Sequence, residues 1–174
     1  MEVEIKVSAD LNEIKSRLLE LGGEHLSTRN QRDTYYSAPH RDFAETDEAV
    51  RIRVDNGDAY LTYKGPKIDS RTKSREEFEV EVNDPREMDS ILRSLGFEEF
   101  ETVSKRREVY SLGEYEILLD DVKGLGEFVE VEREADEDEF DEAREGVIGI
   151  IEKLGIDPSE SIRKSYLGLL LENG

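Results

Sequence analysis

The chain has 174 residues, enough for one domain with a hydrophobic core, and it carries 44 acidic against 24 basic residues. The resulting formal net charge of −20 argues against a broad nucleic-acid-binding face. The sequence has no cysteine, which excludes disulfides, thiolate metal sites and a cysteine nucleophile. No apolar run approaches the roughly 20 residues of a spanning helix, and no apolar leader precedes the first charged residues, so we expect a cytoplasmic protein without membrane contact. We interpret the acidic excess as a halophile-like surface, on which high salt screens the repulsion.

The opening segment Glu2–Val7 alternates charged and apolar residues, which is the pattern of a strand with two different faces. One face carries Glu2, Glu4 and Lys6, and the other carries three β-branched side chains. The charged face either lies in water or lines an interior that binds an ion, and this segment alone favours water.

The first half of the chain continues with a helix and three strands. Leucine and isoleucine at helical spacing predict the helix, and alternation predicts the strands. These elements are expected over residues 10–22, 27–37, 49–54 and 59–64. Asn56-Gly57 is a hairpin turn between the last two strands, Gly65-Pro66 is expected to end the second of them, and residues 67–74 are expected to form a mobile loop.

The second half repeats this plan, with strands and helices in a similar order. The elements are expected over residues 77–82 (strand), 85–95 (helix), 103–112, 115–121 and 128–132 (strands), and 139–154 and 158–171 (helices). The similarity of the halves hints at a duplicated half-barrel. Because no linker separates them, we treat residues 1–174 as a single domain.

Charged residues recur in phase on one face of these strands. The acids are Glu2, Glu4, Glu77, Glu79, Asp120, Glu130 and Glu132, and the bases are Lys6, Arg51, Arg53, Lys64, Lys105 and Arg107. The opposite faces are apolar, so the helices are expected to cover them. The charged faces then belong to an open wetted sheet with cross-strand ion pairs, or to the interior of a closed antiparallel barrel. In a barrel the acids would hold a hard divalent cation and the bases phosphate oxygens, and the pattern alone leaves both readings open.

Eight blocks in sequence order resemble the CYTH superfamily, the triphosphate tunnel metalloenzymes that include class IV adenylyl cyclases, thiamine triphosphatases and inorganic triphosphatases. The blocks are Glu2-x-Glu4-x-Lys6, Asp33-Thr34-Tyr35-Tyr36, Arg51-x-Arg53, Leu61-Thr62-Tyr63-Lys64-Gly65, Glu77-x-Glu79-x-Glu81, Lys105-x-Arg107, Leu119-Asp120-x-Val122-x-Gly124-Leu125-Gly126-x-Phe128-Val129-Glu130-Val131-Glu132 and Lys164-Ser165-Tyr166-x-x-Leu169-Leu170. The last two look closest to the class IV cyclase-like branch.

The resemblance implies an α+β fold, a closed eight-stranded antiparallel barrel (the triphosphate tunnel) with helices outside. It implies Mg²⁺ or Mn²⁺ on Glu2, Glu4, Asp120, Glu130 and Glu132. It implies triphosphate contacts from Lys6, Arg51, Arg53, Lys64, Glu79, Lys105, Arg107 and Lys164, with Glu4, Asp120 and Lys64 as the catalytic set.

The activity implied is that of a metal-dependent enzyme acting on a triphosphate-bearing small molecule. The first candidate is adenylyl cyclase-like conversion of ATP to cyclic AMP and pyrophosphate. The alternatives are hydrolysis of inorganic, thiamine or nucleoside triphosphate, and a non-catalytic nucleotide- or polyphosphate-binding module. A homodimer fits the family.

Overall fold

The computed structural model describes residues 2–67 and 75–173, which form two compact units. Unit 1 comprises residues 2–29 and 105–173, and unit 2 comprises residues 30–67 and 75–104. Beyond Lys67, the loop predicted over 67–74 lies outside the described residues. In this part of the chain no helix is both long enough and apolar enough to cross a membrane.

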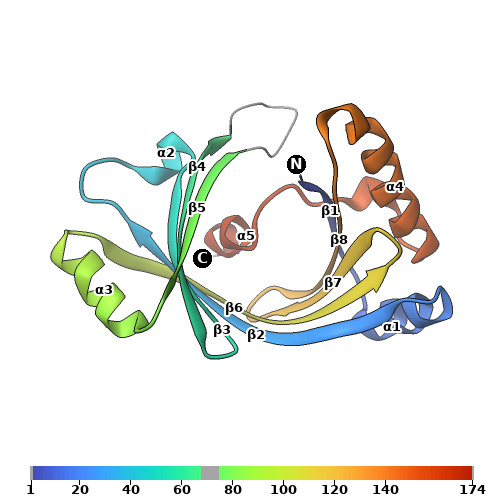
Figure 1. Cartoon of the computed structure of the whole chain (residues 1–174), viewed down its shortest axis with the longest axis horizontal. Helices are drawn as coiled ribbons and strands as arrows, with labels where there is room; N and C mark the ends of the chain where they lie inside the picture. The colour runs from blue at the N-terminus through green and yellow to red at the C-terminus, as the bar shows by residue number, and fades with distance from the viewer. Residues whose placement is uncertain (1, 68–74, 174) are drawn as a thin grey trace. The chain divides into compact units, whose positions relative to one another are not determined.

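Eight strands of the described chain form an antiparallel sheet in the order β1-β8-β7-β6-β2-β3-β4-β5 (Figure 1). The two longest strands, β2 (Glu24–Ser37) and β6 (Glu98–Leu112), each contribute one part to either unit. The α+β class with an eight-stranded antiparallel sheet is therefore confirmed. Within residues 2–67 and 75–173 the strand order ends at β1 and β5, so the strand pairing itself does not close a barrel.

Unit 1 is built from both ends of the chain. Besides its parts of β2 and β6 it contains β1 (Glu2–Ser8), α1 (Leu11–Glu20), β7 (Tyr115–Val122), β8 (Gly126–Glu134), the 3₁₀ turn η1 (Glu137–Glu139), α4 (Phe140–Lys153), the 3₁₀ turn η2 (Pro158–Glu160) and α5 (Tyr166–Asn173). β1 pairs with β8, β8 with β7, and β7 with β6. Asp10 caps α1, accepting hydrogen bonds from the backbone N–H groups of Asn12 and Glu13.

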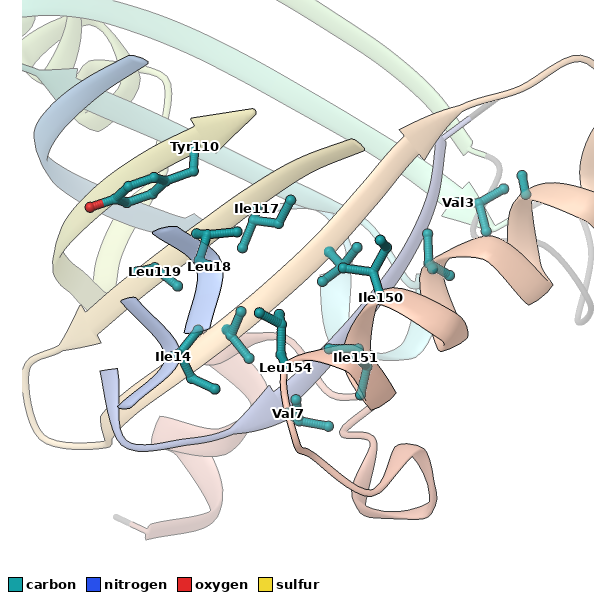
Figure 2. Packing of buried hydrophobic residues seen from close by; sticks show 14 of the residues in the cluster. Val3, Val7, Ile14, Leu18, Tyr110, Ile117, Leu119, Ile150, Ile151 and Leu154 are labelled. Carbon is teal, nitrogen blue, oxygen red and sulfur yellow. The ribbon is translucent and has the colours of Figure 1, made fainter. Parts of the chain in front are cut away.

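The core of unit 1 lies on the apolar face of its strands, where α1 and α4 cover it. The side chains of Val3 and Val7 on β1 lie in the same cluster as those of Ile150 and Ile151 on α4 (Figure 2). The strand side chains in this cluster are Val3, Val7, Tyr110, Ile117, Leu119, Val129 and Val131, and the helical ones include Ile14, Leu18, Val147, Ile150 and Ile151. Each fully buried aliphatic side chain contributes roughly 1.5–3 kcal/mol. This packing fixes which face of β1, β7 and β8 carries the charged residues.

Unit 2 is a continuous stretch of the chain. Besides its parts of β2 and β6 it contains α2 (Phe43–Thr46), β3 (Ala49–Asp55), β4 (Asp58–Lys67), β5 (Arg75–Val82) and α3 (Pro85–Ser94). Its smaller core joins Tyr36, Val50 and Ile52 of the strands to Leu92 of α3. Asn56 and Gly57 both have positive φ, 49° and 96°, as expected of a tight hairpin turn.

The prediction that Gly65-Pro66 ends the strand was wrong. β4 runs on to Lys67, and its register against β5 shifts between Lys64 and Lys67. A proline, which has no N–H to donate, is tolerated where such an irregularity interrupts the ladder.

The single helix predicted over 158–171 was also wrong. Asp157 caps one 3₁₀ turn, η2, and the chain becomes helical again only at Tyr166. Between them, the backbone N–H of Ile162 donates to the carbonyl of Lys6 at 2.7 Å. A tertiary hydrogen bond to the edge of β1 therefore replaces the helical one that periodicity predicted.

Candidate functional site

The charged face of unit 1 starts with three carboxylates from two neighbouring strands. Glu4 pairs in register with Glu132, and one oxygen each of Glu2, Glu4 and Glu132 lies within 4.8 Å of the others. Glu2 is exposed, whereas Glu4 and Glu132 are half-buried. Burial, followed by the charges of Glu2 and Glu130, raises the pKa of Glu132 well above its usual range. Three carboxyl groups held this close provide the oxygen ligands that a hard divalent cation prefers. Such a cation would also offset the repulsion between them.

Asp120 and Arg107 form a bidentate ion pair on this face. Arg107 donates from Nε and Nη2 to the two oxygens of Asp120, both at 2.7 Å, and Tyr166 donates its hydroxyl to Asp120 Oδ2 at 2.7 Å. Asp120 is fully buried, but hydrogen bonds from Arg107 outweigh burial and lower the pKa of Asp120. Burial opposes the charge of Arg107, but Asp120 and then Glu130 raise its pKa. Both groups are therefore held in the charged state.

Three further predicted residues of unit 1 lie around this pair. Glu130 is buried and its Oε1 is 3.6 Å from Arg107 Nη2. Lys6 faces Glu130 across the β1–β8 ladder, and Lys6 and Lys105 are both buried. Their ammonium groups lie 4.4 Å and 5.4 Å from the centre of the Tyr166 ring. Acids and bases thus share one face, as the alternation predicted.

The charged face of unit 2 is dominated by bases. Arg53 donates from Nε and Nη2 to the two oxygens of the buried Asp33, at 2.6 and 2.7 Å, and Arg51 Nη1 is 3.9 Å from Asp33 Oδ2. Arg51 is buried, and its Nε has no hydrogen-bond partner among the described residues. A buried guanidinium nitrogen without a partner is costly unless a ligand reaches it, and phosphate oxygens fit guanidinium geometry.

Lys64 and Glu79 lie on the neighbouring strands of this face. In register, Lys64 faces Glu77 and their charged atoms are 3.8 Å apart, while Thr62 donates its hydroxyl to Glu79 at 2.9 Å. Burial, followed by the charge of Arg51, lowers the pKa of Lys64. A lysine of this kind exchanges its proton nearer neutral pH than an ordinary one.

The structure thus sorts the predicted residues into two sets. The unit 1 face carries Glu2, Glu4, Lys6, Lys105, Arg107, Asp120, Glu130 and Glu132, and the unit 2 face carries Arg51, Arg53, Lys64 and Glu79. Lys164 differs, since its side chain is 57% exposed and forms an ion pair with Glu172. Asp120 is not in the three-carboxylate group, and its oxygens accept hydrogen bonds from Arg107 and Tyr166.

Two residues of these faces received no role from the sequence, although both stand in blocks that carry the family resemblance. Asp33 holds Arg53, and Tyr166 touches Asp120, Lys6 and Lys105. Alternation along the segment around Asp33 places it on the charged face, but nothing local names its partner. Tyr166 lay in a predicted amphipathic helix, where an aromatic residue indicates core.

The CYTH domain family matches residues 1–166. This chain belongs to the CYTH family. A candidate adenylate cyclase of Methanocaldococcus jannaschii is 44% identical to this CYTH protein over 171 residues, covering 97% of this chain and 98% of the relative. The adenylate cyclase CyaB of Aeromonas hydrophila is 27% identical over 170 residues, covering 95% and 86%.

Solved CYTH-like structures agree with the fold. The PH1819 protein of Pyrococcus horikoshii has a TM-score of 0.88 and 42% identity, with 100% of both chains covered. A Hippeastrum protein, named as an adenylyl cyclase candidate with a dominant triphosphatase activity, has a TM-score of 0.74 at 22% identity and covers 99% of this chain and 96% of its own. That second likeness shows the fold alone.

Proposed function

We propose that this CYTH protein is a divalent-metal-dependent enzyme acting on a triphosphate, with ATP converted to cyclic AMP and pyrophosphate as the leading reaction. The observation that carries the proposal is the three-carboxylate group of Glu2, Glu4 and Glu132 on the same face as Arg107, Lys6 and Lys105. Binding an anion needs only the bases, so a set of converging acids beside them favours metal-assisted chemistry over a passive polyphosphate-binding module.

The donor set fits Mg²⁺ or Mn²⁺, because both prefer carboxylate oxygens, and metal dependence is general in the CYTH family. Glu2, Glu4 and Glu132 would hold the ion, with Glu130 beside them. When bound, the ion neutralises phosphate charge and so favours departure of the leaving group. Both oxygens of Asp120 accept hydrogen bonds from Arg107, and one of them also accepts from Tyr166, so we assign Asp120 the task of orienting Arg107.

The basic residues bind and orient the phosphates. Arg107, Lys6 and Lys105 of unit 1 and Arg51, Arg53 and Lys64 of unit 2 each offer a positive group on a charged strand face. Arg51 Nε, buried without a partner in the described chain, gains a hydrogen bond when a phosphate oxygen arrives. Lys64, whose pKa is lowered by burial and by Arg51, is our candidate for moving the proton of the attacking hydroxyl.

In the cyclisation, the ribose 3′-hydroxyl attacks the α-phosphorus, one P–O bond forms, the bond to the bridging oxygen breaks, and pyrophosphate leaves. The hydroxyl proton is taken by the base. In the alternative, water attacks the terminal phosphorus and orthophosphate leaves. The names of the two cyclase relatives favour the first reaction. The Hippeastrum protein has the same fold and a triphosphatase name, so the fold does not choose between them.

We also propose that the strands form the closed barrel that the family resemblance implies. Charged faces in a barrel interior need counter-ions or ligands, and the buried Lys6, Lys105 and Arg51 are side chains that a triphosphate would match. Hydrogen exchange with and without inorganic triphosphate tests it. We expect protection of β1 and β8 and also of β3 and β4, whereas protection of only one of these strand pairs would contradict the closed barrel.

The activity is tested by product analysis at high salt with Mg²⁺ or Mn²⁺ and ATP, inorganic triphosphate or thiamine triphosphate. Cyclic AMP with pyrophosphate supports the leading reaction, and orthophosphate supports the triphosphatase. Tight binding without turnover supports the binding module and overturns the enzyme. Glu4→Gln is the negative control for metal-dependent turnover, and Glu152→Gln, an exposed acid on α4, is the matched control.

A further inference from the structure

Tyr166, the first residue of α5, makes polar contacts that the proposed function does not use. Its side chain is 6% exposed. The hydroxyl donates to Asp120 Oδ2 at 2.7 Å, and the ring lies 4.4 Å from the Lys6 ammonium and 5.4 Å from that of Lys105. One aromatic side chain therefore touches Lys6 and Lys105, two predicted phosphate-binding bases of unit 1, directly, and it reaches a further one, Arg107, through Asp120.

Three contacts hold Tyr166 and the residues next to it in place. The N–H of Ile162 donates to the carbonyl of Lys6, tying the preceding segment to β1. Ser165 caps α5, since its hydroxyl accepts the N–H of Gly168 at 3.0 Å. The ring of Phe128 on β8 packs against Tyr166 with centres 5.2 Å apart. The ring is thus held by β1, β8 and its own helix cap.

A ring suits this position because its face attracts an ammonium group without bringing a negative charge. A carboxylate in its place would compete with phosphate oxygens for the same protons. Burial, followed by the charges of Glu130 and Asp120, raises the pKa of Tyr166, so its hydroxyl stays protonated and remains a donor to Asp120.

We propose that Tyr166 is a positioning residue that orients Lys6, Lys105 and Arg107 toward the phosphates. The ring orients the ammonium groups of Lys6 and Lys105. The hydroxyl donates to Asp120, and the fixed carboxylate of Asp120 accepts both hydrogen bonds from Arg107. The identity of the ligand rests on the proposed function, whereas the orientation of the three cations does not.

The test separates the ring from the hydroxyl. Tyr166→Phe keeps the ring and loses the donor, and Tyr166→Leu loses both while keeping apolar bulk. Tyr110→Phe, which removes the hydroxyl of another buried tyrosine of unit 1 on the opposite strand face, is the matched control. The readouts are the affinity for inorganic triphosphate in EDTA, by calorimetry, and the NMR shifts of the ε-methylene groups in protein labelled with ¹³C-lysine, assigned with Lys6→Arg and Lys105→Arg.

We expect Tyr166→Phe to weaken triphosphate binding about fivefold, the value of one hydrogen bond, and Tyr166→Leu by about 30-fold or more. In wild type and Tyr166→Phe the ring shifts the Lys6 and Lys105 signals upfield, and in Tyr166→Leu that shift disappears. In an Asp120→Ala background, which removes the acceptor, Tyr166→Phe should add nothing further, because the two changes break one linked contact.

Two results would overturn the proposal. One is a folded Tyr166→Leu that binds triphosphate as well as Tyr110→Phe does, and the other is lysine signals that do not respond to loss of the ring. If Tyr166→Leu does not fold, Tyr166→Phe and its cycle with Asp120→Ala still decide the role of the hydroxyl. If the wild-type protein does not bind triphosphate, the proposed function fails, and the lysine shifts still show whether Tyr166 orients Lys6 and Lys105.

Discussion

Arg107 and Asp120 face each other across β6 and β7, and both nitrogens of the Arg107 fork donate to Asp120 at 2.7 Å. Unit 2 has the same arrangement in Arg53 and Asp33, at 2.6 and 2.7 Å across β3 and β2. In each unit, a buried aspartate thus holds an arginine on the charged face. A bidentate pair fixes the plane of the guanidinium and leaves its remaining N–H groups for a ligand.

Asp120→Asn should damage both stability and phosphate binding. An amide presents one acceptor where Arg107 needs two, and it leaves a buried guanidinium charge without compensation. We expect a loss of about 3 kcal/mol or more in the free energy of unfolding, as for other broken buried pairs. Urea denaturation measures this loss. The neighbour Asp121 is exposed, so Asp121→Asn should stay near wild type, and equal effects of both changes would contradict the assignment.

Asp33→Asn tests the corresponding pair in unit 2. Arg53 loses its bidentate acceptor and Arg51 loses a nearby charge, so both become less well placed for phosphate oxygens. We expect KM for the triphosphate substrate to rise about tenfold or more, with a smaller change in kcat, since a binding interaction is lost. Steady-state kinetics provides the measurement. Asp58→Asn, at an exposed position on β4, is the control, and an unchanged KM in Asp33→Asn would remove the positioning role.

Glu4→Gln should separate metal binding from folding. The change removes one of three converging carboxyl groups and the negative charge of Glu4, so the metal-free protein should unfold at a slightly higher temperature than wild type. Excess Mg²⁺ or Mn²⁺ should raise the Tm of wild type, because a ligand at 100 times its Kd contributes about 2.7 kcal/mol. The same addition should leave the Tm of Glu4→Gln nearly unchanged. Thermal scans followed by circular dichroism measure both, with Glu152→Gln responding like wild type; an equal metal response in Glu4→Gln would exclude Glu4 as a ligand.

Glu48 predicts a pH dependence of stability in unit 2. Hydrogen bonds from Arg41, Thr46 and Tyr63 lower the pKa of Glu48 to about 2. A carboxyl whose pKa is lowered in the folded state stabilises the protein above its ordinary pKa of about 4.5, and this contribution disappears as the pH falls toward about 2.

The unfolding free energies of wild type and Glu48→Gln should therefore differ most above about pH 5 and converge between about pH 4.5 and 2. Urea denaturation at a series of pH values measures the difference. Glu45→Gln, at an exposed position of α2, should show no such convergence. A gap between wild type and Glu48→Gln that stays constant with pH would contradict the role of Glu48.

Alternation was a sound guide to the strand faces. It placed Glu2, Glu4 and Lys6 on one side of β1, and in the β1–β8 register Glu4 pairs with Glu132 and Lys6 with Glu130. The helices cover the apolar faces as expected, because Val3 and Val7 pack with α4. These features depend on local periodicity, so each can be predicted from a single segment of the sequence.

Tertiary partners were not accessible in the same way. The sequence gives no measure of whether Asp120 faces a metal or an arginine, and only the β6–β7 register places it opposite Arg107. The C-terminal helix was predicted in one piece because Ile162 fits its periodicity, while in the structure Ile162 bonds to Lys6, about 156 positions earlier in the chain. Tyr166 therefore begins α5, and helical periodicity does not predict its contacts with Asp120, Lys6 and Lys105.

Unit 2 is one uninterrupted stretch, whereas unit 1 joins the first strand to strands that follow more than 100 positions later. Since chains emerge from the ribosome N-terminus first and long-range pairing is slow, unit 2 can fold while β1 still waits for β8. Glu2 and Glu4 are made first but meet Glu132 only after β8 has emerged. A growing chain therefore cannot assemble the proposed metal site before β8 is made, and a polypeptide truncated before β8 would lack one of the three carboxyl groups.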